Sequence, residues 1–141
     1  LGYREELEGL ARDHGLRYAP TISRPGEEPD WSGLTGRVEA LLEPERIEQT
    51  EQALGLEAGH LRPSTSAVLI CGLQGTIANT IHHLVPRGFV PDNRKLRRGL
   101  EVDESTPASL YWEQYDNTPV IDTKDEAVMS TLRANLRAAQ G

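Results

Sequence analysis

Three short motifs of this chain carry side chains that could bind phosphate or take part in redox chemistry. The first contains Ser23 and Arg24, the second is the turn at residues 71–75, and the third contains Glu113 and Tyr115. Each motif lies at or near the end of a short apolar run, which is where open α/β sheets bind their ligands. Together the three motifs predict a redox nucleotide site.

The first motif could bind a phosphate group. A guanidinium such as that of Arg24 can form two parallel hydrogen bonds to phosphate, and the hydroxyl of Ser23 can donate a third. Arg37 follows Gly36 at an expected helix start and could return to the same phosphate. In dinucleotide-binding folds an arginine in this region accommodates the 2′-phosphate of NADP. The alternative is that both arginines are ordinary surface residues, and this pair by itself does not decide between the two.

The second motif combines a lone cysteine with a glycine-containing turn. Cys71 ends an apolar strand, and Gly72 and Gly75 would let the backbone turn sharply and a flat ligand approach closely. Leu73 and Gln74 lie in this turn, directly before an expected helix whose free N–H groups would point at that ligand. The alternative is a small buried cysteine on a strand. The turn favours the functional interpretation.

The third motif has a spacing of two residues, which places both side chains on the same face of a strand. The carboxylate of Glu113 could handle a proton, and the ring of Tyr115 could stack on a flat ligand. A polar residue beside core aromatics would give the same pattern, so this alternative remains open.

Composition limits the class of protein. The chain has 141 residues, enough for one domain with a core, and its net charge of −7 argues against nucleic acid or an anionic membrane as the main partner. No apolar run approaches the roughly 18 residues of a membrane span. The single cysteine excludes an internal disulfide and fits a reducing, cytoplasmic location.

Local patterns predict strands that alternate with helices. The expected strands cover residues 16–23, 67–70 and 110–115, and the expected helices cover 3–11, 38–42, 45–54 and 76–84. A last helix follows Asp122 or Thr123, with Thr123 and Glu126 as a capping box. Such alternation predicts an α/β fold with a mostly parallel sheet covered on both faces.

In their order along the chain, the three motifs resemble the NADP-binding domain of the ferredoxin–NADP reductase family of flavoproteins. Residues 1–7 (LGYREEL) look like the family segment after the second strand of that domain, and residues 21–24 with 35–37 are similar to the bacterial pattern that binds the 2′-phosphate. Residues 71–75 resemble the cysteine-glycine motif beside the nicotinamide. Glu113-x-Tyr115 resembles the carboxy-terminal glutamate and flavin-stacking aromatic of the family.

This resemblance implies a Rossmann-like, mostly parallel sheet flanked by helices over residues 1–115, followed by an extension with a docking helix over 116–141. It also implies NADP(H) and FAD as cofactors and an electron-transfer reaction with ferredoxin or flavodoxin. Cys71 would pack against the nicotinamide, Glu113 would form a hydrogen bond in the same pocket, and Tyr115 would cover the flavin. The binding residues carried over are Ser23, Arg24, Arg37, Gly72, Leu73, Gln74 and Gly75.

The chain also departs from the family pattern. The FAD domain, the first strand and the Gly-rich loop of the family are absent from these residues, so we expect a piece of a longer protein that is inactive alone. The chain continues beyond Tyr115, which makes Tyr111 and Trp112 alternative flavin contacts. Two other interpretations are the reductase component of an oxygenase system and a non-catalytic nucleotide-binding module.

Two further features have open interpretations. The basic cluster Arg94, Lys95, Arg97 and Arg98 could dock an acidic ferredoxin or form a solvated loop. Trp31 could cover an adenine ring or anchor its loop.

Overall fold

A computed structural model describes residues 2–141 as a mixed α/β fold with two small parallel sheets of two strands each. The helices are α1 (Arg4–His14), α2 (Ile47–Ala53), α3 (Gln74–Leu84), α4 (Arg94–Gly99) and α5 (Glu126–Gln140). The strands are β1 (Thr21–Ile22), β2 (Leu34–Thr35), β3 (Val68–Gly72) and β4 (Leu110–Gln114). Short 3₁₀ helices are η1 (Pro25–Glu27), η2 (Val38–Leu42) and η3 (Val85–Arg87). The α/β class expected from the sequence is therefore confirmed.

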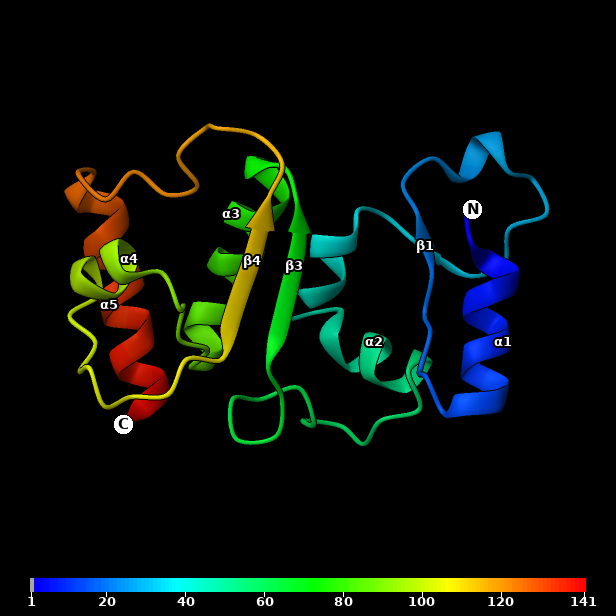
Figure 1. The fold of residues 1–141 in the computed structure, drawn as a ribbon, viewed down its shortest axis with the longest axis horizontal. Helices are drawn as coiled ribbons and strands as arrows, with labels where there is room; N and C mark the ends of the chain where they lie inside the picture. Colours follow the sequence, from blue (N-terminus) through cyan, green and yellow to red (C-terminus); the bar gives the residue numbers. More distant parts are fainter. Residues whose placement is uncertain (1) are drawn as a thin grey trace.

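The strands lie in two separate pairs rather than in one sheet. β1 pairs with β2, and β3 pairs with β4, both in parallel. In Figure 1 the strands β1, β3 and β4 run in the same direction, so their carboxyl ends lie along one side of the molecule. The first strand is much shorter than the expected 16–23, because its partner β2 ends after two residues at Gly36, which has a φ of 105°.

The hydrophobic core is built from β3, β4 and the helices that follow them. Its fully buried members include Ile77, Ile81, Phe89, Leu110 and Leu132. The helix α5 contributes its own buried stripe and packs against η3, so the segment 116–141 belongs to this core. By contrast, α1 buries no residue, and the described chain before Glu39 contains no buried side chain.

The ends of the helices agree with the local sequence signals, except at the start of α5. Gly15 ends α1 in the left-handed conformation, and Pro86 lies in η3 directly after α3, as expected. The capping box predicted for Thr123 is wrong, because Asp125 caps α5 and accepts hydrogen bonds from the backbone N–H groups of Ala127 and Val128. A carboxylate beside the first turn is a strong acceptor for these free N–H groups.

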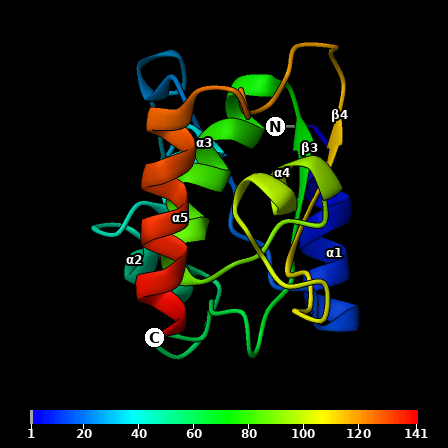
Figure 2. The same ribbon diagram turned by 90° about the vertical axis from the view of Figure 1, so that its left-hand side faces the viewer.

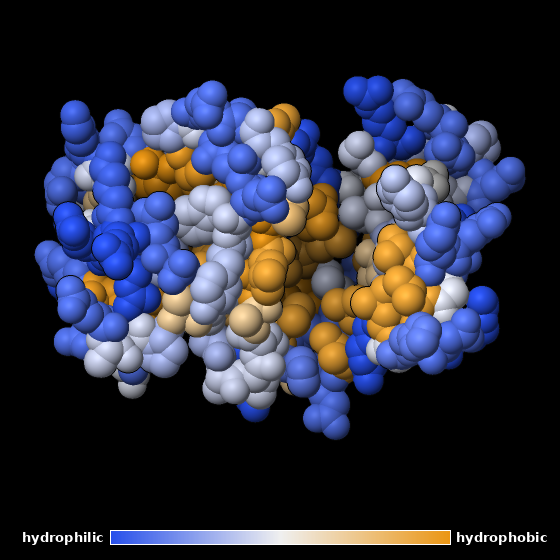
Figure 3. Space-filling model, in the orientation of Figure 1, coloured by the Kyte–Doolittle hydropathy of each residue, from blue (hydrophilic) through white to orange (hydrophobic). Residues whose placement is uncertain are grey.

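Helices cover only one face of the β3–β4 sheet. Ile70 points toward α3 and α5 and is buried, whereas Leu69, Cys71 and Tyr111 point the other way and are exposed. Figure 2 shows α3 and α5 on the same side of the sheet, and Figure 3 shows apolar surface in the middle of the opposite side. The expectation of cover on both faces is therefore wrong for the described residues, and Leu69 remains 77% exposed.

Candidate functional site

The second and third motifs meet at the carboxyl end of the β3–β4 sheet. Cys71 lies opposite Glu113 in the register of the two strands, and the N–H of Tyr115 donates to the carbonyl of Gly72 at 2.9 Å. Cys71, Glu113 and Tyr115 are all exposed on the open face, while Gln114 between the last two is half-buried. The sequence prediction that the spacing of two places both side chains on one face is confirmed. The alternative of a buried cysteine is wrong.

These three side chains also interact. The Cys71 side chain, by hydrogen bonding and by its charge, raises the pKa of the Tyr115 phenol, and the negative charge of Glu113 raises it further. The phenol therefore stays protonated, and able to donate a hydrogen bond, over a wider pH range than a free tyrosine. The group presents a thiol, a phenol and a carboxylate to whatever contacts this face.

The other two aromatic candidates are placed differently. Tyr111 lies on the open face, but its hydroxyl donates to the carbonyl of Ala108 at 3.0 Å, toward the amino end of β4. Trp112 packs against the hydrophobic core on the covered side. Of the three aromatic residues, Tyr115 is the one whose pKa the Cys71 side chain raises.

The carboxylate of Asp116 accepts a hydrogen bond at the start of α3. The N–H of Gln74 donates to Oδ2 of Asp116 at 3.1 Å, and the amide of Gln114 also donates to Asp116. These hydrogen bonds, that from Gln114 first, lower the pKa of Asp116. The N–H of Gln74 is therefore not free for a ligand, as the helix start was expected to be, because sequence spacing does not reveal a carboxylate that comes from the segment after β4.

The glycines of the turn are not needed for a strained backbone. Neither Gly72 nor Gly75 has a positive φ. The expectation that a sharp turn requires glycine at these two positions is therefore wrong. A Cβ at Gly72 would lie 3.4 Å from Cβ of Thr76, whereas one at Gly75 would meet nothing within 4 Å. Leu73, between them, is exposed. Gly75 leaves open space through which a ligand could approach the turn.

The first motif lines a pocket at the carboxyl end of β1. The pocket has a volume of about 480 Å³, and its lining residues are Arg4, Thr21, Ile22, Ser23, Arg24, Glu27, Glu28 and Trp31. Arg24 forms an exposed ion pair with Glu27 at 3.4 Å. Arg4 is not among the binding residues that the sequence predicts. The indole N–H of Trp31 donates to the carbonyl of Leu34 at 2.8 Å, so this residue anchors its own loop.

Arg37 does not line this pocket. Its Nε donates to Oε1 of Glu39 at 2.8 Å, and the Glu39 side chain is only 5% exposed. Burial by itself would raise the pKa of Glu39, but hydrogen bonds from its own backbone N–H and from Arg37 outweigh burial and lower it. The structure places Gly36 beside the end of β1, with its N–H donating to the carbonyl of Ile22 at 2.9 Å, yet the guanidinium of Arg37 is engaged elsewhere.

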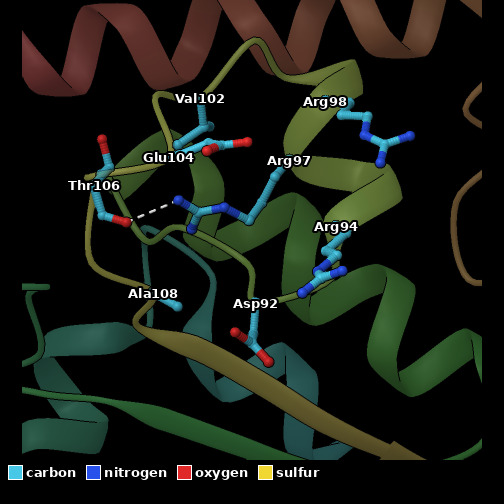
Figure 4. A pocket seen from close by; sticks show the side chains of 8 residues that line it. All are labelled: Asp92, Arg94, Arg97, Arg98, Val102, Glu104, Thr106 and Ala108. Atoms are coloured by element: carbon cyan, nitrogen blue, oxygen red, sulfur yellow. Dashed lines mark hydrogen bonds between the residues drawn. The ribbon is translucent and has the colours of Figure 1, made fainter.

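The basic cluster lies on the helix α4 and not in a loop, and three of its residues, all except Lys95, line a separate pocket of about 610 Å³. Figure 4 shows Arg94, Arg97 and Arg98 around it. Arg97 is structural, because it donates to the carbonyls of Asp103 at 3.0 Å and Thr106 at 2.8 Å. The chain enters β4 from this pocket, which therefore lies at the amino end of the strand, opposite the end that holds Glu113.

Comparisons with protein-family models and with curated proteins found no match to this chain. None of the helices in residues 2–141 has the length and apolar character needed to cross a membrane. The described residues form a mixed α/β fold with two candidate sites. One site lies at the carboxyl end of β1 and the other at the carboxyl ends of β3 and β4, on the same side of the molecule.

The contact between Tyr115 and Cys71 predicts a measurable titration. Replacing Cys71 by alanine should lower the pKa of Tyr115, because the hydrogen bonding and the charge of the cysteine side chain, which favour the neutral phenol, are both lost. Glu113→Gln should lower this pKa less, since it removes only a nearby negative charge. Titration of the tyrosine Cζ resonances by ¹³C NMR would check both variants. Tyr111 serves as the internal control, and an unchanged Tyr115 resonance in Cys71→Ala would contradict the contact.

Proposed function

We propose that this chain is the NADP(H)-binding part of a flavin-dependent ferredoxin or flavodoxin–NADP reductase, with a Rossmann-like fold. The observation that carries the proposal is the convergence of Cys71, Glu113 and Tyr115 on an open sheet face at the carboxyl ends of β3 and β4. The sequence resemblance assigns these residues to the nicotinamide and flavin site, and the geometry brings together residues that lie 42 positions apart (113 minus 71).

The open face offers apolar and aromatic surface on which flat rings could stack. Leu69 and Tyr115 present apolar and aromatic surface that is 77% and 64% exposed, and the thiol of Cys71 lies between strand and turn. In the proposed reaction NADP(H) and FAD supply the hydride chemistry when they are bound. The chain's residues would orient the rings: Cys71 would contact the nicotinamide, Glu113 would accept a hydrogen bond from it, and Tyr115 would cover the flavin.

Within residues 2–141 no strand pairs with the second edge of β3, which supports a sheet that continues in a longer protein. Val68 donates its N–H to Ser109, and Gly72 accepts the N–H of Tyr115, both at 2.9 Å on the β4 side. Because successive residues of a strand direct their backbone groups to alternate sides, the N–H and C=O groups of Leu69 and Cys71 point away from β4. Parallel sheets are normally buried on both faces. An upstream strand and an upstream FAD-binding domain would provide the missing partner and cover.

The experiment that tests this proposal uses the protein purified from its native gene. Intact mass and visible absorbance are measured first, and NADPH and NADH are then titrated separately under anaerobic conditions. We expect a yellow protein larger than this chain that is bleached preferentially by NADPH. A colourless protein that responds to neither coenzyme would overturn the reductase proposal and favour a non-catalytic nucleotide-binding module.

A further inference from the structure

The carboxylate of Asp116 links the two strands at the end of the sheet where Cys71 and Tyr115 lie. Its Oδ2 accepts the N–H of Gln74 at 3.1 Å, and its Oδ1 accepts the side-chain amide of Gln114. Gln74 is the first residue of α3, which follows β3, whereas Gln114 is the last residue of β4. One carboxylate therefore joins the segment after β3 to the end of β4.

The two glutamines also bind the loop that follows Asp116. The side chain of Gln74 donates to the carbonyl of Val120 at 3.2 Å, and the side chain of Gln114 donates to the carbonyl of Thr118. Val120 packs against the hydrophobic core. Asp116 is half-buried between these connections, so its position is fixed by α3 on one side and by its own loop on the other.

Asp116 comes directly after Tyr115, where the pairing of β3 with β4 has ended. The strand register stops at Gly72 and Gln114, one pair beyond Cys71. The side chain of Tyr115 is exposed, and because few contacts restrain an exposed side chain, the place of the phenol depends on the backbone that carries it. The N–H of Tyr115 donates to the carbonyl of Gly72, and Asp116 holds the next residue of the same backbone.

We propose that Asp116 is a positioning residue, which holds Tyr115 against Cys71 and Glu113 by fastening the end of β4 to the start of α3. Hydrogen bonds to a carboxylate are stronger than those to a neutral acceptor, so an aspartate suits this role. The consequence for catalysis rests on the proposed function, because hydride transfer requires that two rings be held in one geometry. Asp116 itself does not touch the rings and acts through Tyr115.

A double-mutant cycle in the 141-residue chain tests the positioning role, with the pKa of Tyr115 followed by ¹³C NMR of the tyrosine Cζ resonances. Asp116→Ala removes both hydrogen bonds and should lower this pKa by about half as much as Cys71→Ala does. In the Cys71→Ala background, Asp116→Ala should have a much smaller effect, because the contact through which it acts is already lost. Asp92→Asn removes the same charge from an exposed residue at the opposite end of the sheet and is the matched control.

A second variant keeps the test valid if Asp116→Ala unfolds, which urea unfolding would show. Asp116→Asn can accept only one of the two donors, because its NH₂ group would face the other, and it should lower the pKa of Tyr115 in the same direction by a smaller amount. An equal decrease with and without Cys71 would mean that only the charge of Asp116 acts on the phenol, which overturns the positioning role. An unchanged pKa in both variants overturns it as well.

The consequence for catalysis is measured in the flavoprotein purified from the native gene. Asp116→Ala should lower kcat for NADPH oxidation by about tenfold and change KM by less than about twofold, since positioning acts on the transition state. An unchanged kcat would overturn the role in hydride transfer. A native protein without flavin would overturn the proposed function alone, and the titration of Tyr115 would still decide whether Asp116 positions this site.

Discussion

Replacing Glu51 by glutamine should lower the free energy of unfolding by about 2–3 kcal/mol, the loss expected when charge-assisted hydrogen bonds to buried groups are removed. The Glu51 residue is 1% exposed, and its two carboxylate oxygens accept the N–H groups of Gly59 and Leu61, each at 2.8 Å. These bonds hold the loop between α2 and β3. A glutamine side chain can accept only one of them, and its NH₂ group would face the other N–H donor.

The effect of Glu51→Gln should depend on pH. Burial would raise the pKa of Glu51, but the two backbone N–H groups and the positive charges of Arg87 and His60 outweigh burial and lower it. The folded-state pKa therefore lies below the value of about 4.3 for an unfolded glutamate. The stabilisation by the carboxylate is complete above that value and is lost as the pH falls through the folded-state pKa.

Urea unfolding at pH 7 and at pH 3 would check this prediction. The difference between Glu51→Gln and the unaltered chain should be largest at pH 7 and should narrow at pH 3. Glu48→Gln, an exposed glutamate on the same helix, is the matched control and should change stability by less than about 0.5 kcal/mol. An equal loss at both pH values would contradict the role of the ionised carboxylate.

The region from β3 to the end of α3 could be predicted from the sequence because its signals are local. The apolar run at 67–70, the glycine-containing turn and the proline at 86 mark a strand, a turn and the end of a helix. The pairing of Cys71 with Glu113 joins residues that are far apart in the sequence. It followed from one general rule, that the carboxyl ends of parallel strands lie along the same edge.

Contacts that depend on tertiary packing could not be predicted in the same way. The six-residue helix α4 lacks clear periodicity, and the side chain of Asn93 caps it by accepting the N–H of Leu96 at 2.9 Å. Arg37 was available in the sequence for a phosphate, but a buried carboxylate two residues away engages it. Arg4 faces Trp31 only because α1 packs beside the β1 loop, a placement that spacing along the chain does not contain.

The open face of the β3–β4 sheet shows a related limit of sequence patterns. A continuous apolar run predicts that a strand is suited to burial on both faces, but it does not say what covers it. Here α3 and α5 cover one face, and Leu69 is left on the other. The β3 sequence is therefore more apolar than burial of one face alone requires.

Replacing Leu69 by aspartate should have opposite results in this chain and in the longer flavoprotein of the proposed function. In the 141-residue chain Leu69 is exposed, so the change should alter the free energy of unfolding by less than about 0.5 kcal/mol. In the longer protein the upstream segments would cover this face. An unpaired carboxylate buried there costs several kcal/mol, enough to weaken flavin retention by more than about tenfold.

The comparison needs both polypeptides and one control variant. Urea unfolding measures the stability of the 141-residue chain, and the ratio of flavin to protein absorbance measures retention in the longer protein. Val38→Asp changes another exposed aliphatic residue that lies outside the sheet, and it should leave flavin bound. If Leu69→Asp leaves the flavin content unchanged, no upstream domain covers this face. If instead the variant unfolds the 141-residue chain, Leu69 stabilises the fold itself, and the open face is not a docking surface. Only loss of flavin with an intact chain supports an upstream domain seated on β3 and β4.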